Sequence, residues 1–203
     1  MMGSGGNNND SSNILSFIKP GSIGAEIGVW KGGSSKKFIA KKLAKFYMVD
    51  PWAISGYQPA IDANDNTFSY EAYLNKYSKQ TGGKTPEAFQ KFYDKIYAKV
   101  YDDFSKITNV EICRMSSTEW FDTYSGDKLD WVYIDGDHSY TGVITDLTNC
   151  IKVLKPNGII LGDDYKWHTT GDKGGVKKAV NEFVEKYNYT LEKHGKIQFS
   201  IIR

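Results

Sequence analysis

The chain has 203 residues and a nearly balanced charge, with 26 lysines and arginines against 24 acids. This length fits one domain with a sizeable core, and a net charge of +2 gives no strong attraction to nucleic acid or to an anionic membrane. No apolar run approaches the roughly 20 residues that cross a bilayer, and two cysteines are too few for a disulfide framework. We therefore expect a soluble, cytoplasmic protein that acts on a small molecule.

The first half of the chain predicts a strand, a helix and a second strand. Residues 1–12 are rich in Gly, Asn and Ser, so we expect a disordered tail, followed by a single domain over residues 13–203. Residues 13–19 predict a short leading helix. Residues 23–27 and 46–49 predict strands on either side of a glycine-rich turn and an amphipathic helix. This order is a βαβ unit.

Residues 53–84 show no regular hydrophobic period and combine turn-forming residues with several aromatic ones. A connection of this length is usually either a functional lid or a disordered segment. The aromatic content favours the lid, so we predict an inserted lid over about residues 53–84. Thr85 and Pro86 then predict the start of a long amphipathic helix.

The second half of the chain continues the alternation. Strands are predicted at residues 109–113, 131–134 and 159–161, each followed by a helical pattern, and Ser116 is the expected cap of a short helix. The tail predicts two strands about a turn at His194 and Gly195. The whole pattern predicts an α/β fold with a mostly parallel, doubly wound sheet.

Acidic residues gather where the predicted strands end. Glu26 lies in the first strand, Asp50 follows the second, Asp135 follows the fourth, and Asp163 and Asp164 follow the fifth. In open α/β sheets, ligands bind outside the carboxyl ends of the strands. We therefore expect these acids to surround one site.

The glycine turn from Glu26 to Ser34 has the spacing E-x-G-x-x-x-G-x-S, which differs from the G-x-G-x-x-G of dinucleotide sites. Gly28 would allow a ligand to approach the backbone closely, and Asp50 occupies the position that binds ribose hydroxyls in nucleoside sites. Ordinary turn glycines and a helix-capping aspartate would explain the same residues, and this alternative stays open.

Five motifs in this order resemble class I S-adenosylmethionine-dependent methyltransferases, and more narrowly the small-molecule O-methyltransferases of the catechol and macrolide-sugar kind. The motifs are E-I-G-x-x-x-G-x-S at 26–34, VDPW at 49–52, YIDGDHSY at 133–140, LKPNG at 154–158 and GDDY at 162–165. The resemblance implies a seven-stranded Rossmann-like sheet in the order 3-2-1-4-5-7-6 with an antiparallel C-terminal hairpin.

The resemblance also implies a cofactor and an acceptor. The cofactor would be S-adenosylmethionine, and the acceptor a hydroxyl of a small molecule such as a sugar, a phenol or another natural product. Asp50 would accept the ribose hydroxyls, and Ser116 and Ser117 would flank the adenine. The full set of expected cofactor-binding residues is Glu26, Gly28, Trp30, Gly32, Ser34, Asp50, Ser116, Ser117 and Asp135.

Metal-dependent relatives carry an aspartate after strand four and an acidic pair after strand five, which implies a cation held by Asp135, Asp163 and Asp164. Oxygen ligands suit Mg²⁺, Mn²⁺ or Ca²⁺, and a cation relieves the repulsion between clustered carboxylates. The alternative is that one of the paired acids caps a turn or contacts the cofactor.

His138 and Asp135 are the expected catalytic residues. A histidine pKa of about 6.5 suits proton removal at neutral pH, and His138 is the expected base, with Lys166 and His168 in reserve. Two other functions stay open. A nicotinamide-dependent oxidoreductase would use Tyr189-x-x-x-Lys193, and a non-catalytic module would bind a nucleoside without turnover. A homo-oligomer is also compatible with the sequence.

Overall fold

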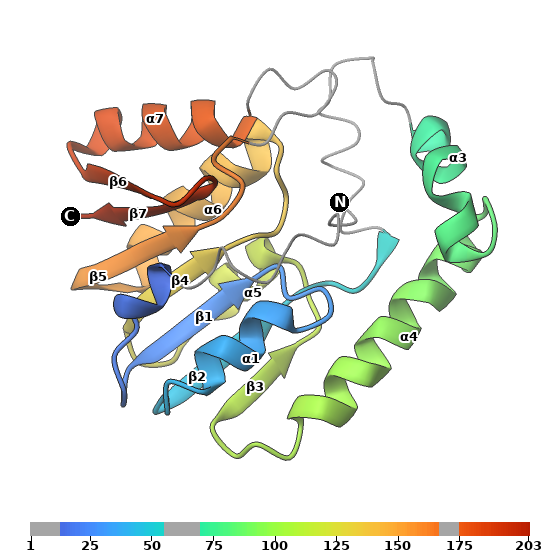
Figure 1. Ribbon diagram of the computed structural model, residues 1–203, viewed down its shortest axis with the longest axis horizontal. Helices are drawn as coiled ribbons and strands as arrows, with labels where there is room; N and C mark the ends of the chain where they lie inside the picture. Colours follow the sequence, from blue (N-terminus) through green and yellow to red (C-terminus); the bar gives the residue numbers. More distant parts are fainter. Residues whose placement is uncertain (1–12, 55–69, 167–174) are drawn as a thin grey trace.

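The protein is built on one seven-stranded sheet with helices on both faces (Figure 1). The computed structural model describes residues 13–54, 70–166 and 175–203, so the predicted tail lies outside the described residues. The strand order is β3-β2-β1-β4-β5-β7-β6, which confirms the predicted order. The strands are β1 (Ile23–Ile27), β2 (Lys45–Val49), β3 (Val110–Cys113), β4 (Leu129–Ile134), β5 (Leu154–Gly162), β6 (Thr190–His194) and β7 (Gln198–Ile202).

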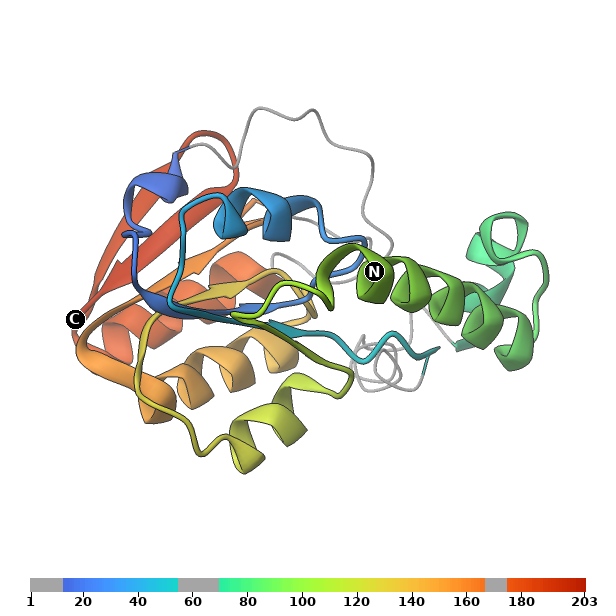
Figure 2. The ribbon, with the colours of Figure 1, turned by 90° about the horizontal axis from the view of Figure 1, so that it is seen from below.

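The first five strands are parallel, whereas β7 runs antiparallel to both β5 and β6, as the predicted terminal hairpin requires. Figure 2 shows α5, α6 and α7 on one face of the sheet and η1, α1 and α4 on the other. None of these helices, within the described ranges, is long and apolar enough to cross a membrane. The helices are η1 (Ile14–Ser16), α1 (Gly33–Ile39), α3 (Tyr70–Thr81), α4 (Pro86–Phe104), α5 (Ser117–Thr123), α6 (Tyr140–Val153) and α7 (Gly175–Tyr187).

The central strand β4 contributes side chains to both hydrophobic cores. Trp131 and Tyr133 are buried on the α1 and α4 side, where their rings lie 5.3 and 5.1 Å from that of Phe38. Val132 and Ile134 are buried on the opposite side, among residues of α5, α6 and α7. A strand covered on both faces reads as a continuous apolar run, which explains why the sequence predicts β4 so clearly.

Part of the predicted lid is a helix. Residues 70–81 form α3, whose Tyr73 and Leu74 are buried against α4, and the hydroxyls of Tyr73 and Tyr93 lie 3.1 Å apart. Residues 55–69 of the predicted lid lie outside the described residues. Its role as a lid therefore stays a prediction.

The strand order places the site. Between β1 and β4 the chain changes direction across the sheet, because β2 and β3 lie on one side of β1 while β4 and β5 lie on the other. Ligands of open α/β sheets bind at such a reversal, at the carboxyl ends of the strands.

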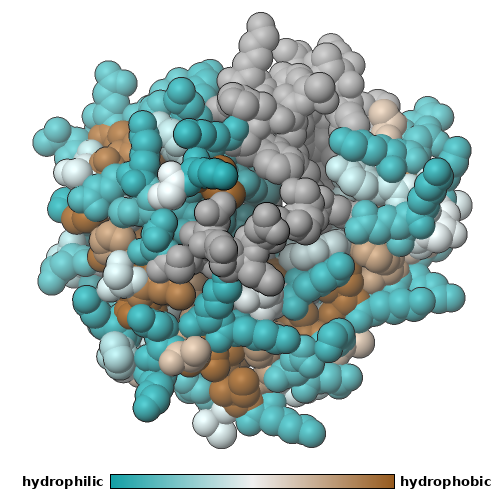
Figure 3. Space-filling view, viewed as in Figure 1, coloured by the Kyte–Doolittle hydropathy of each residue, from teal (hydrophilic) through white to brown (hydrophobic). Residues whose placement is uncertain are grey.

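The face of the molecule in Figure 3 is mainly hydrophilic, with hydrophobic residues visible in separate patches.

Candidate active site

The loops that follow β1 and β4 touch at the centre of the sheet edge. Ile27 and Ile134 pair in these neighbouring strands, and the N–H of Asp135 donates to the carbonyl of Ile27 over 2.8 Å. Gly28 has a φ of 90°, and a Cβ at this position would lie 2.3 Å from the carbonyl oxygen of Asp135. Only glycine allows this close approach.

Asp50, which follows β2, has a buried carboxylate that fixes the surrounding loops. Its Oδ2 accepts from the backbone N–H of Trp30 over 2.9 Å, and its Oδ1 from that of Trp52 over 2.7 Å. Burial raises the pKa of Asp50, and these amide donors oppose the rise. A carboxylate has about four acceptor positions. Asp50 can therefore bind its two amides and still accept from ribose hydroxyls.

A cavity of about 620 Å³ lies beside Asp50, between the ends of β1, β2 and β3 and the first turns of α5 and α6. Four of the predicted cofactor residues line it, and Arg114 and Asp146 also belong to its wall. A concave space with a few polar groups is typical of small-molecule sites. This cavity is the candidate cofactor site, and the predicted residues in its wall are Gly28, Asp50, Ser116 and Ser117.

Glu26 lies next to this cavity but not in its wall. Its buried carboxyl group accepts a hydrogen bond from the hydroxyl of Ser35, the residue after the predicted Ser34. Burial is the main cause that raises the pKa of Glu26 well above its usual value, and two nearby acids add to the rise. Ser34 itself is half-buried in the first turn of α1.

Gly32 and Trp30 hold the glycine turn against α4. Gly32 has a φ of 74°, and a Cβ there would lie 2.5 Å from the ring of Phe104. The ring of Trp30 lies 5.9 Å from those of Phe92 and Tyr93. Packing therefore explains both residues without a ligand, and their role in cofactor binding stays a prediction.

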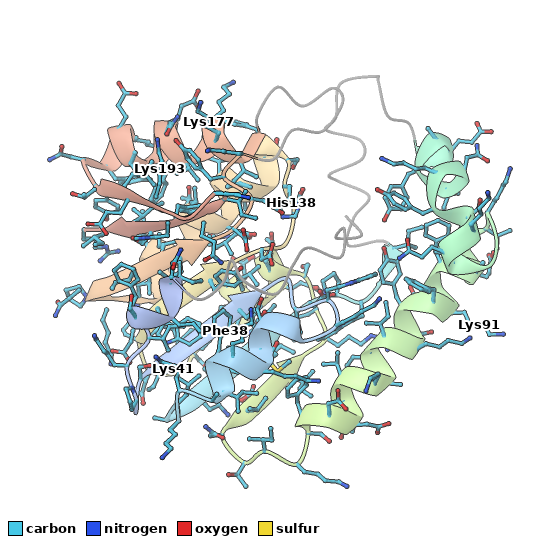
Figure 4. The ribbon with its side chains drawn as sticks, viewed as in Figure 1. Phe38, Lys41, Lys91, His138, Lys177 and Lys193 are labelled. Atoms are coloured by element: carbon cyan, nitrogen blue, oxygen red, sulfur yellow. The ribbon has the colours of Figure 1, made fainter. Side chains whose placement is uncertain are left out.

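Asp135, His138 and Asp164 form a compact cluster at the ends of β4 and β5. One ligand atom from each lies within 4.8 Å of the others. The Nε2 atom of His138 is 3.4 Å from Oδ1 of Asp135 and 3.1 Å from Oδ2 of Asp164. Figure 4 shows His138 at this edge of the sheet, close to the start of α6. The structure thus brings together residues from two strand ends, as the sequence predicts.

Burial and charge act on this cluster in opposite directions. Burial raises the pKa of Asp135 and raises that of Asp164 to about 6, with His138 opposing both shifts. Burial alone would lower the pKa of His138, but the hydrogen bond and the negative charge of Asp135, together with Asp164, raise it overall. The site therefore favours a positive charge between the two carboxylates.

Asp163 does not join this cluster. Its Oδ2 accepts from the hydroxyl of Tyr133 over 2.8 Å and from Nε2 of Gln198 over 3.3 Å. Its Oδ1 accepts from the backbone N–H of Asp164 over 2.8 Å. The three acids predicted as metal ligands are thus not the set that the structure groups, because His138 occupies the third position.

Asp137 organises the start of α6. It accepts from the backbone N–H and the hydroxyl of Ser139 over 2.8 and 3.0 Å. Ser139 is the N-cap, and its hydroxyl oxygen accepts from the N–H of Gly142 over 3.0 Å. These bonds fix the loop that carries His138. Ser139 could have been identified from the sequence, since a serine before a helical pattern is a typical cap.

Asp146 is also absent from the predicted site. It is an acid on the face of α6 that carries the buried residues Val143 and Leu147, and an acid among such residues can be noticed in the sequence.

Ser116 has its predicted role as the cap of α5, in a capping box with Glu119. Of the reserve bases, Lys166 is exposed and His168 lies outside the described residues.

Comparisons with known proteins agree with this architecture. A family model described as a methyltransferase domain matches residues 25–165. The O-methyltransferase NovP is similar in structure, with a TM-score of 0.58, 16% identity and coverage of 97% of this chain and 77% of that chain. SMU.1697c, a putative methyltransferase from Streptococcus mutans solved with SAH, has a TM-score of 0.53 and 13% identity over 92% of this chain and 93% of that chain.

A curated relative, the uncharacterized protein R132 of Acanthamoeba polyphaga mimivirus, is 24% identical over 164 residues, which are 78% of this chain. The aligned part spans 58% of the length of R132. The nicotinamide alternative has no support, since its Lys193 lies on strand β6 at the edge of the sheet. The chain belongs to the methyltransferase-domain family, and its sheet has the fold of the solved methyltransferase structures.

Proposed function

We propose that this enzyme methylates a hydroxyl oxygen of a small molecule, with help from a divalent cation. The observation that carries the proposal is the cluster of Asp135, His138 and Asp164 at the strand ends. Structural likeness alone does not select the acceptor, because similar folds include an N-methyltransferase and a putative rRNA methylase as well as NovP. A near-neutral chain with a cluster of acids offers little attraction to a polyanion.

The donor set of the cluster fits a cation. Asp135 and Asp164 are half-buried, and the negative charge of Asp135 raises the pKa of Asp164, so both carboxylates gain stability when a positive charge lies between them. Asp135 and Asp164 would hold the ion, and their oxygen atoms suit Mg²⁺, Mn²⁺ or Ca²⁺. When bound, such an ion would make an acceptor hydroxyl more acidic.

His138 would act as the base. A nitrogen of its imidazole ring would take the proton of the acceptor hydroxyl, and the negative charges of Asp135 and Asp164 would offset the positive charge of the imidazolium that results. The acceptor oxygen would then form a bond to the methyl carbon as the carbon–sulfur bond breaks, leaving S-adenosylhomocysteine. The loops fixed by Asp50 and Asp137 would hold the reactants in line.

The cation proposal is tested with methyl-labelled cofactor and a panel of sugars, phenols and other hydroxylated metabolites. We expect turnover in Mg²⁺ or Mn²⁺, a loss of at least 100-fold in chelator or in Asp164→Asn, and unchanged binding of S-adenosylhomocysteine in both cases. Asp122→Asn, which changes an exposed acid on α5, is the matched control. Full activity in chelator would refute the cation.

The base proposal needs a second measurement, because Nε2 of His138 could bind the ion itself. We expect His138→Ala to lose at least 100-fold in kcat while Mn²⁺ affinity, measured by electron paramagnetic resonance, changes less than threefold. Lost Mn²⁺ binding would identify His138 as a ligand, and unchanged turnover would exclude both roles.

A further inference from the structure

Asp146 is a buried acid in the wall of the cofactor cavity. It lies on α6, its side chain is 2% exposed, and it faces the cavity together with Thr145 of the same helix and Ser117 of α5. The apolar residues Val143 and Leu147 surround it on its own helix. A carboxyl group in such a position is costly unless it has a specific partner.

One such partner of Asp146 is Ser117. The hydroxyl of Ser117 is within hydrogen-bonding reach of its carboxyl group, and Asp137 acts on it with a like charge. Burial is the dominant effect, and it raises the pKa of Asp146 to about 7. Cys150 lies one turn further along α6, and after burial the negative charge of Asp146 is the second cause that raises the pKa of its thiol. Near neutral pH, the group can therefore hold a proton.

We propose that Asp146 recognises the adenine of S-adenosylmethionine, through the 6-amino group and N1 of the base. A protonated carboxyl group has one donor and one acceptor, and the 6-amino group and N1 of adenine present the complementary pair. Asp50 lines the same cavity and is suited to the ribose, so an adjacent subsite is available for the base. The inference rests on the cofactor occupying this cavity, and it is independent of the acceptor and of the cation.

Calorimetric titration of S-adenosylhomocysteine at pH 6.5 tests this proposal with two variants. Asp146→Asn keeps a donor and an acceptor in a side chain of the same shape, so we expect an affinity within threefold of that of the wild type. Asp146→Ala removes both groups, and we expect the affinity to fall at least tenfold. Circular dichroism checks that each variant is folded.

A purine analogue of S-adenosylhomocysteine that lacks the 6-amino group separates recognition from structural support. The wild type should bind the analogue at least tenfold more weakly than S-adenosylhomocysteine, whereas Asp146→Ala should bind both within threefold of each other. If the wild type does not discriminate, the proposal is overturned even where Asp146→Ala is unfolded. If the wild type binds neither ligand, the cavity assignment fails together with the proposal.

The pH dependence provides a third result. Because the ligand is expected to bind the protonated acid, wild-type affinity should fall as the pH rises from 6 to 8.5, while that of Asp146→Asn should stay nearly constant. Asp137 and Cys150 face Asp146 and are unchanged in this variant, so the difference belongs to Asp146. Equal pH profiles for the two proteins would contradict the proposal.

Discussion

At the scale of single residues, Asp50 shows how the site is formed before any ligand arrives. Its two amide partners belong to Trp30 and Trp52, whose φ angles of 53° and 39° are in the left-handed region. Each such residue costs on the order of 1 kcal/mol or more. The charged hydrogen bonds to Asp50 offset this cost, so the carboxylate and the loops hold one another in place.

We therefore expect Asp50→Ala to destabilise the fold as well as to weaken cofactor binding. The change leaves two amides without their acceptor, which should lower the free energy of unfolding by about 2 to 4 kcal/mol. Urea denaturation at pH 7 measures this loss, and Asp127→Ala, at an exposed position, is the control. A loss below about 0.5 kcal/mol would mean that the amides find other partners.

The positions of the site residues at the strand ends could be predicted, but the directions in which their side chains point could not. Asp135 and Asp164 are predictable because a buried strand must end where polar residues begin. The side chain of Asp163 instead turns toward Tyr133 and Gln198, which lie 30 and 35 residues away in the sequence. Such long-range partners leave no signal in the local pattern, and the cluster therefore contains His138 instead of Asp163.

At the scale of elements, the start of α6 depends on the glycine at position 142, which has no side chain. A Cβ on Gly142 would lie 2.2 Å from Oδ2 and 2.6 Å from Cβ of Asp137. Asp137 cannot move away without releasing both of its bonds to Ser139. The glycine in the first turn of this helix therefore keeps the loop with His138 in its present form.

Gly142→Ala should consequently reduce stability, although alanine favours helices over glycine. The lost bonds of Asp137 should outweigh the helical gain of about 1 kcal/mol, for a net loss of about 1 to 2 kcal/mol. Gly33→Ala is the matched control, because a Cβ in the first turn of α1 has no neighbour within 4 Å. Thermal unfolding compares the two variants, and equal losses would argue against the contact with Asp137.

The elements differ in how far the sequence determines them. The strand β4 and the long amphipathic helix α4 follow from hydrophobic runs and periods, and one face of α4 is buried. Helix α3 does not follow from such a pattern. Its buried residues Tyr73 and Leu74 pack mainly on α4, and they give only a weak hydrophobic period in an otherwise polar sequence. Its packing partner had to be known before the helix could be predicted.

At the scale of the whole molecule, carboxyl groups with a raised pKa concentrate at the carboxyl edge of the sheet. Burial is the first cause that raises the pKa of each of these side chains. A carboxyl group with a higher pKa in the folded than in the unfolded protein binds protons more tightly when folded. Stability must then decrease as the pH rises through the interval between the two values. The acids are Glu26, Asp50, Asp135 and Asp146.

For Asp146, the decrease in stability with rising pH is large enough to be measured. Its pKa is about 7 in the fold against an ordinary 3.8, so its favourable contribution is complete below pH 4 and is lost as the pH rises to about 7. In the ligand-free protein, Asp146→Asn should therefore become more stable relative to the wild type by about 2 kcal/mol between pH 5 and pH 7. Urea unfolding at several pH values measures this difference. A constant difference between the two proteins would show that Asp146 does not titrate in this range, because only its ionisation distinguishes the wild type from the variant as the pH changes.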